Sequence, residues 1–152
     1  MSLAYRRLVR LIEINSDQLA NSLLRKLQTT EKCKDFCKVP PEELRQRVYE
    51  IYKNLGDWLL SKTEADIEKR YCEIGRWRAQ QAVPLSQVIW AITLVKENLL
   101  EFLQRETIDD KVHEVFDEVE VTQMLDQFFN YACFYAAVGY ETAVAAHAAA
   151  GK

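Results

Sequence analysis

The stretch Leu125–Tyr140, LDQFFNYACFYAAVGY, decides the fold class of this chain. Its apolar and aromatic side chains point around the full circumference of a helix at about 100° per residue, so they do not form a single stripe. A helix of this kind must be covered on several sides. Two arrangements achieve this: the segment is either the central helix of a bundle or one half of a dimer interface.

Helical periodicity continues outward from this stretch over nearly the whole chain, and the sustained alternation typical of strands is missing from the sequence. We therefore predict an all-α, five-helix bundle that forms one domain over residues 1–152. Asn15 and Ser16 interrupt the first helix and are expected to bend it. The predicted helices span residues 4–28, 41–61, 64–82, 84–105 and 115–149.

Composition limits the class of partner. Hydrophobic residues make up 49 % of the 152 residues and charged residues 28 %, which excludes intrinsic disorder. The net charge of −3 argues against nucleic acid as the main partner, because binding phosphates requires an excess of Lys and Arg. No apolar run is long enough to cross a membrane, and the start lacks a signal-peptide pattern. We expect a cytoplasmic protein that does not contact a membrane.

The residues that catalysis or a cofactor would require are scarce. The only histidines are His113 and His147, so a haem ligand on a mid-chain helix is missing, as is any Glu-x-x-His pair for a di-iron centre. The four glycines form no phosphate-binding or nucleophile-elbow motif. We predict a protein that is not an enzyme and has no cofactor and no metal.

The cysteines leave three interpretations open. Cys33 and Cys37 lie four residues apart, which on a helix would place both thiols on one face. With Cys72 and Cys133 they have the number of ligands for a zinc site, although the spacing matches no strong zinc signature. A redox-responsive pair and simple packing are the other two interpretations. We expect free, metal-free thiols.

Arg78 is the candidate for ligand binding, because it lies on the predicted inner face of its helix, four residues after Ile74. A buried guanidinium without a partner is very costly, so it must form an internal ion pair or contact a ligand. Gly75 on the same face allows another backbone to approach. The candidate ligand pocket is lined by Arg78, Tyr71, Trp90 and Phe128.

The aromatic residues of the last helix are the candidates for a homodimer interface. Some of them are expected to lack a partner within the chain, and a large exposed apolar patch is unusual on a soluble monomer. The predicted interface residues are Phe116, Phe128, Phe129, Phe134, Tyr135 and Tyr140.

Two runs of sequence resemble a known family. They are PEELRQRVYEIYKNLGDWLL from Pro41 and YCEIGRWRAQQAVPLSQVIWAITLVKENLLEFL from Tyr71. Together they look like the amino-terminal helical domain of RsbRD-type stressosome proteins, the co-antagonists of the RsbT kinase. That family has a Gly-x-x-Arg-Ala-x-x-Gly-φ-Pro-Leu step, which is matched here from Gly75 to Leu85, with Ala82 where the family more often has Gly. The resemblance covers about residues 5–105.

The resemblance implies a sensory or regulatory module that precedes an output domain, dimerises, has no catalytic residues to carry over and is related to globins without haem. We therefore expect a non-enzymatic signal-input or protein-interaction domain of a bacterial regulator. It would form a homodimer, bind a regulatory protein or output domain and pass a signal through its long last helix. The alternative function is a small-molecule or cofactor carrier with an apolar pocket inside the bundle.

Overall fold

The computed structural model describes residues 3–107 and 115–151, except for the side chains of residues 3–5, 8, 107 and 115–118. Within these residues the chain is helical and contains no strand, which confirms the predicted all-α class. None of these helices combines the length and apolarity needed to cross a membrane. The elements are α1 (Leu3–Ile14), α2 (Ser16–Thr29), the 3₁₀ helix η1 (Glu31–Lys38), α3 (Pro41–Lys53), α4 (Leu55–Leu60), α5 (Glu64–Gln80), α6 (Leu85–Thr107) and α7 (Val115–Ala150).

The expected count of five is not confirmed, because two of the predicted helices are divided at asparagines. Asn15 separates α1 from α2, and its side-chain amide donates a hydrogen bond to the Leu11 carbonyl at 2.8 Å. Asn54 separates α3 from α4 and donates in the same way to the Glu50 carbonyl at 3.2 Å. The backbone N–H of each asparagine bonds the same carbonyl at 3.1 Å, so the carbonyl is shared between backbone and side chain at the point where one helix ends and the next begins.

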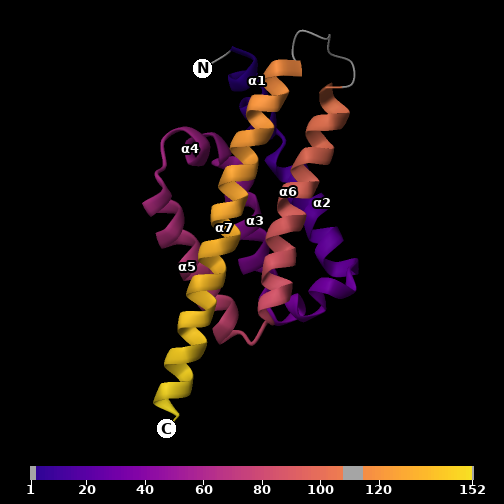
Figure 1. Ribbon diagram of the computed structural model, residues 1–152. Coiled ribbons are helices and arrows are strands. Elements are labelled where there is room, and N and C mark those ends of the chain that lie inside the picture. The colour runs from indigo at the N-terminus through magenta and orange to yellow at the C-terminus, as the bar shows by residue number, and fades with distance from the viewer. Residues whose placement is uncertain (1–2, 108–114, 152) are drawn as a thin grey trace.

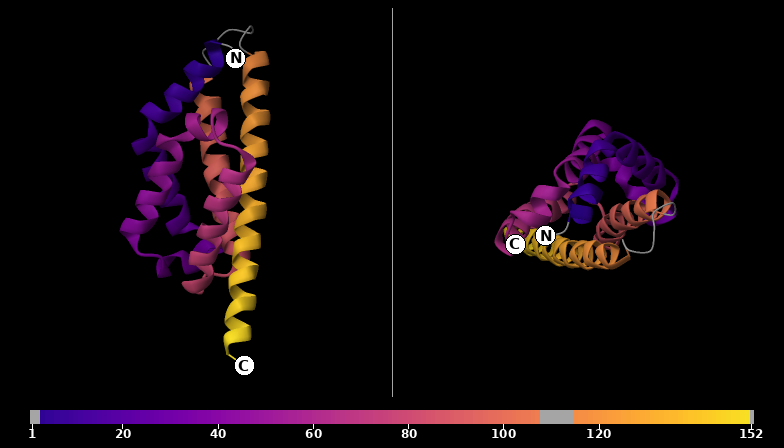
Figure 2. Two further views of the ribbon diagram at one scale, coloured as in Figure 1. Left: turned by 90° about the vertical axis from the view of Figure 1, so that its left-hand side faces the viewer. Right: turned by 90° about the horizontal axis from the view of Figure 1, so that it is seen from above.

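Helix α7 lies on the outside of the bundle. Figures 1 and 2 show α5 and α6 on either side of it, with α1–α4 behind, and its C-terminal end projecting past the other helices. One stripe of α7 faces inward, including Leu125 and Ala132, which are fully buried. The helix is therefore not central, and much of its other face is open.

A buried polar cluster joins three of the helices behind α7. Asn98 on α6 donates to the Leu19 carbonyl at 3.1 Å and to the Tyr52 hydroxyl at 3.2 Å. Tyr52 in turn donates to the Val95 carbonyl at 2.9 Å. Both side chains are buried and fully bonded, so the cluster sets the register of α2, α3 and α6 without leaving an unpaired group.

The turn between α5 and α6 has a backbone conformation that favours glycine. Ala82 has φ 58°, while the N–H of Val83 donates to the Arg78 carbonyl and that of Ala82 to the Ala79 carbonyl. These bonds are those of a Schellman motif, in which the left-handed residue is usually Gly. Helix α5 therefore ends at Gln80, two residues before the predicted end, and Ala82 adopts a strained conformation.

Replacing Ala82 by Gly is expected to raise the free energy of unfolding by roughly 0.5–1 kcal/mol. Relief of left-handed strain, about 1–2 kcal/mol, exceeds the cost of the more flexible unfolded chain, about 0.4–1 kcal/mol. Urea unfolding measures the difference. Ala79→Gly in the last turn of the same helix is the control and is expected to lower stability, so an equal loss in both variants would contradict the assignment.

Candidate functional site

Arg78 is buried at the end of α5, with 3 % of its surface exposed. Its Nη1 donates to Glu43 Oε1 at 3.0 Å and to Gln81 Oε1 at 2.8 Å. The amide of Gln81 also donates to Glu43, at 3.2 Å, so the three side chains bind one another. Burial lowers the pKa of Arg78, and Glu43 opposes that effect. The expectation that this inner-face arginine has a partner is confirmed.

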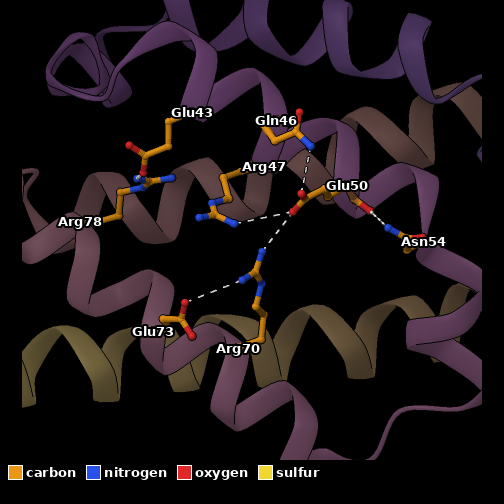
Figure 3. A network of polar contacts seen from close by, with 8 residues as sticks. All are labelled: Glu43, Gln46, Arg47, Glu50, Asn54, Arg70, Glu73 and Arg78. Atoms are coloured by element: carbon orange, nitrogen blue, oxygen red, sulfur yellow. Dashed lines mark hydrogen bonds and ion pairs between the residues drawn. The ribbon is translucent and has the colours of Figure 1, made fainter.

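A second group of charges continues along the same two helices (Figure 3). The carboxylate of Glu50 on α3 forms ion pairs with Arg70 on α5, at an N–O distance of 3.2 Å, and with Arg47, at 3.7 Å. Arg70 also forms an ion pair with Glu73, at 3.9 Å. The Arg47 guanidinium lies over the Trp77 ring, 4.3 Å from its centre. We call the set of Glu43, Arg47, Glu50, Arg70, Glu73 and Arg78 the polar seam.

The polar seam contains equal numbers of arginines and glutamates. It bridges α3 and α5 through long side chains, whereas α5 approaches α7 closely along much of its length. Positive and negative charges therefore balance between the two helices, and the seam offers no excess charge to an ionic ligand. The outer pairs of the seam, which join Glu50 to the partly exposed Arg47 and Arg70, contribute little stability and can exchange partners, whereas Arg78 is buried against Glu43.

A small cavity of about 60 Å³ lies beside the polar seam, between α2, α3, α5 and α6. Its wall is almost entirely apolar. Tyr71 and Arg78, two of the four predicted ligand residues, both line it, and so does Arg47. A larger open groove of about 420 Å³ lies between α2, η1 and α3, and Leu27, Phe36 and Leu44 line both spaces.

The other two predicted ligand residues lie elsewhere. Trp90 is half-buried on α6, where the Lys32 ammonium lies 4.1 Å from the centre of its ring. Phe128 on α7 packs edge-on against Tyr71, with the ring centres 5.9 Å apart, and at a tilt against Trp58, with the ring centres 6.1 Å apart; it is not part of the cavity wall. The structure thus brings Tyr71 and Arg78 to one cavity but not Trp90 and Phe128. The ligand site itself stays a prediction.

The predicted interface residues of α7 differ in their surroundings. Phe128 and Phe129 are buried in the core of the single chain, at 4 % and 3 % exposed, and have almost no surface left for a partner. Tyr140 is half-buried, and its hydroxyl donates to the Val83 carbonyl at 2.6 Å. Phe134 is 60 % exposed and packs edge-on against Tyr135. The side chain of Phe116 lies outside the described residues.

Two glycines bring the backbones of α5 and α7 together. A Cβ added at Gly75 would overlap the Ala136 carbonyl, and one added at Gly139 would overlap the backbone of Cys72. Because each glycine lies against the backbone of the other helix, the contact is reciprocal. Helices α5 and α7 are therefore one closely packed pair, and we expect a displacement of α5 to displace α7 as well.

The cysteines are not gathered into one site. Cys33 is buried, and burial raises its pKa to about 11, while Cys37 is exposed. The two differ because η1 is a 3₁₀ helix with a non-helical conformation at Cys33, so the α-helical spacing that would align them does not apply. No group of three metal-ligand side chains occurs within the described part of the chain.

Several members of the polar seam were missed by sequence reasoning. Glu43, Arg47 and Glu50 follow one another at intervals of four and three residues. Arg70, Glu73 and Trp77 follow one another at intervals of three and four. Stripes of charged residues at these intervals are typical of solvated helix faces. The pattern therefore does not predict that the stripe on α3 meets the stripe on α5. The one available signal of their contact was the order of charges, in which acidic and basic residues alternate along both helices.

Comparison with known proteins identifies the family. Residues 17–151 match the family described as the N-terminal domain of the RsbT co-antagonist protein RsbRD. The match includes the last helix, beyond the stretch that carries the resemblance in the sequence. The searches for curated relatives and for solved structures returned no match. Since the family match spans most of the chain, this protein belongs to the RsbRD N-terminal domain family.

Proposed function

We propose that this chain is a cytoplasmic, non-enzymatic input domain that pairs with a second copy and passes a signal to a partner through α7. Its family supports the coarser part of the proposal, a stressosome-type regulatory domain with protein partners. The relation to haem-free globins that the resemblance implies is part of the same proposal. A domain of this kind acts by shifting populations between two packings of its helices.

The contrast between the two sides of α5 carries this proposal. Toward α7, the glycine contacts of Gly75 and Gly139 couple the two helices at the level of the backbone. Toward α3, α5 is bridged by the polar seam, whose outer ion pair between Arg70 and Glu50 can exchange at little cost, while the buried Arg78–Glu43 pair holds the end of α5. A change at the α3 side therefore moves α5 and α7 together, and the projecting end of α7 delivers that movement to a partner.

An exposed aromatic patch on α7 supports pairing with a second copy. Phe134 lies beside Tyr135, and Tyr135 lies beside Tyr131 at 6.3 Å, so the three rings form one patch. Aromatic side chains are enriched at the centres of protein interfaces. Pairing through this patch would bury Phe134 and place the projecting ends of two α7 helices next to each other.

Phe134→Glu is expected to convert a dimer to a monomer at tens of micromolar, because it places a charge at the centre of the patch. Light scattering during size-exclusion chromatography measures the mass. Ile14→Glu is the matched control: Ile14 is another large exposed apolar residue, on α1, and its replacement is expected to leave the dimer intact. A monomeric wild-type chain, or equal loss of the dimer in both variants, would contradict the proposed pairing.

A further inference from the structure

An open groove of about 470 Å³ follows the junction between α5 and α7, close to the end of α7 that projects past the other helices (Figure 1). Polar side chains of α5, among them Lys69 and Arg76, form one wall. Short side chains of α7, among them Ala143 and Ala146, form the other. Gly139, through which α7 contacts the backbone of α5, also lines the groove. The groove therefore lies between two helices that we expect to move together.

The charges in the groove belong to α5 and are mostly positive. Lys69 and Arg76 are exposed, and among the described residues neither side chain forms an ion pair. The acidic residue of the same wall, Glu73, already forms an ion pair with Arg70 of the polar seam. The groove thus carries two unmatched cations, which favour a partner that brings carboxylates to it.

The spacing of the lining residues fits a third helix. Lys69 and Arg76 are seven residues apart, which is about two helical turns or roughly 10 Å along α5. Two carboxylates seven residues apart on another helix have the same separation, so both ion pairs can form when that helix lies along α5. On α7, Gly139, Ala143 and Ala146 follow at intervals of four and three residues and share one face. Because these side chains are short, the backbone of an incoming helix can approach α7 closely.

We propose that this groove binds an amphipathic helix of a partner protein. The apolar face of that helix lies against α7, and two carboxylates seven residues apart pair with Lys69 and Arg76. A helix docked there contacts α5 and α7 at once, so it responds to a displacement of the pair. The inference rests on the proposed function, because the docked helix belongs to the partner that receives the signal.

The first experiment measures binding of a synthetic helical peptide to the full chain by fluorescence anisotropy at low salt. The acidic peptide has about 20 residues, enough to form a helix, with alanine and leucine on one face and two glutamates seven residues apart beside it. In the basic peptide, lysines replace these glutamates. The acidic peptide is expected to bind with a Kd of roughly 10–100 μM, and the basic peptide at least about tenfold more weakly. No saturable binding of the acidic peptide up to about 1 mM would overturn the proposal.

Charge reversal tests whether Lys69 and Arg76 pair with the carboxylates. Lys69→Glu combined with Arg76→Glu is expected to weaken the acidic peptide at least about tenfold and to strengthen the basic peptide, because each carboxylate then meets a like charge. Arg25→Glu combined with Lys53→Glu is the matched control, since it changes the net charge equally at exposed sites on α2 and α3. The control is expected to keep the preference for the acidic peptide. An equal change in both variants would mean that net charge alone governs binding, and would overturn the proposal.

A bulky side chain on α7 tests whether the peptide lies in the groove. Ala146→Phe is expected to weaken the acidic peptide at least about tenfold, because the ring stops the peptide backbone from approaching α7. Ala146 is exposed, so the fold is expected to tolerate the ring. Ala148→Phe is the control: Ala148 is also exposed, but it lies about 200° around the helix from Ala146. Unchanged binding by Ala146→Phe would place the peptide elsewhere and overturn the proposal.

Light scattering separates this inference from the proposed pairing with a second copy. Lys69→Glu combined with Arg76→Glu is expected to leave the mass of the dimer unchanged. Conversion to a monomer would mean that a second copy covers the groove, and would overturn the inference. Phe134→Glu is expected to bind the acidic peptide with an unchanged Kd, because Phe134 does not line the groove. A wild-type chain that is monomeric but binds the acidic peptide would contradict the pairing and support the docking site.

Discussion

Gly139→Ala is expected to lower the free energy of unfolding by at least about 2 kcal/mol, even though alanine is the better helix former. In an isolated helix the replacement of glycine by alanine would stabilise the helix by about 1 kcal/mol. Here the added Cβ meets the backbone of Cys72, which cannot rotate away as a side chain can. The two helices must separate, and their shared apolar contacts weaken along α5 and α7. Gly75→Ala is expected to behave in the same way against Ala136.

The other glycines provide a graded control for this prediction. The atoms nearest to a Cβ at Gly56 belong to the side chains of Glu13 and Val9, which can move, so a smaller loss of stability is expected. A Cβ at Gly151 has its nearest neighbour at 3.5 Å, and its replacement should be nearly neutral. Urea unfolding of the four Gly→Ala variants measures the loss of stability in each and so tests the expected ranking. Stability within about 0.5 kcal/mol of wild type for Gly139→Ala would show that α5 and α7 are not held by this contact.

Glu43→Ala is expected to lower the free energy of unfolding by about 3 kcal/mol, because among the described residues it leaves the buried Arg78 guanidinium with Gln81 as its one remaining hydrogen-bond partner. Breaking a buried ion pair from one side typically costs about 3–5 kcal/mol, and the lower end applies because Glu43 itself is 27 % exposed. Removing the cation is less costly. Arg78→Leu is expected to lose less than Arg78→Ala, since leucine fills part of the space while Glu43 can be hydrated.

Thermal and urea unfolding of the single and double variants test this asymmetry. Glu43→Ala combined with Arg78→Leu is expected to be more stable than Glu43→Ala alone, which is the signature of an uncompensated buried charge. Glu101→Ala is the surface control: it removes the exposed partner of Lys26 and should cost less than about 1 kcal/mol. If Glu43→Ala proved no worse than Glu101→Ala, Arg78 would not depend on its ion pair.

Local chemistry explains where sequence reasoning about the fold succeeded. Pro41 takes the first position of α3 and Thr63 is the N-cap of α5, as the sequence predicts. Helical periodicity and these two end signals depend only on residues close together in the chain, so the sequence alone is enough to predict them. The break at Asn54 was missed because the apolar stripe of the predicted helix continues across this single polar residue. The break at Asn15 was recognised, because Ser16 follows it and the two polar residues together interrupt the helix. A stripe reports which face is buried and does not report whether the axis is straight.

The amino-acid sequence by itself determined the helices, the burial of Arg78 and the need for close approach at Gly75, since periodicity and the cost of an unpaired charge act locally. Only the tertiary structure decided that Glu43 is the partner of Arg78. It also decided that α7 lies outside the bundle, and that Tyr71 shares a cavity with Arg47 while Phe128 does not. These facts depend on how helices far apart in sequence cross. Crossing geometry arises from many small packing contacts, and no single residue pattern records it.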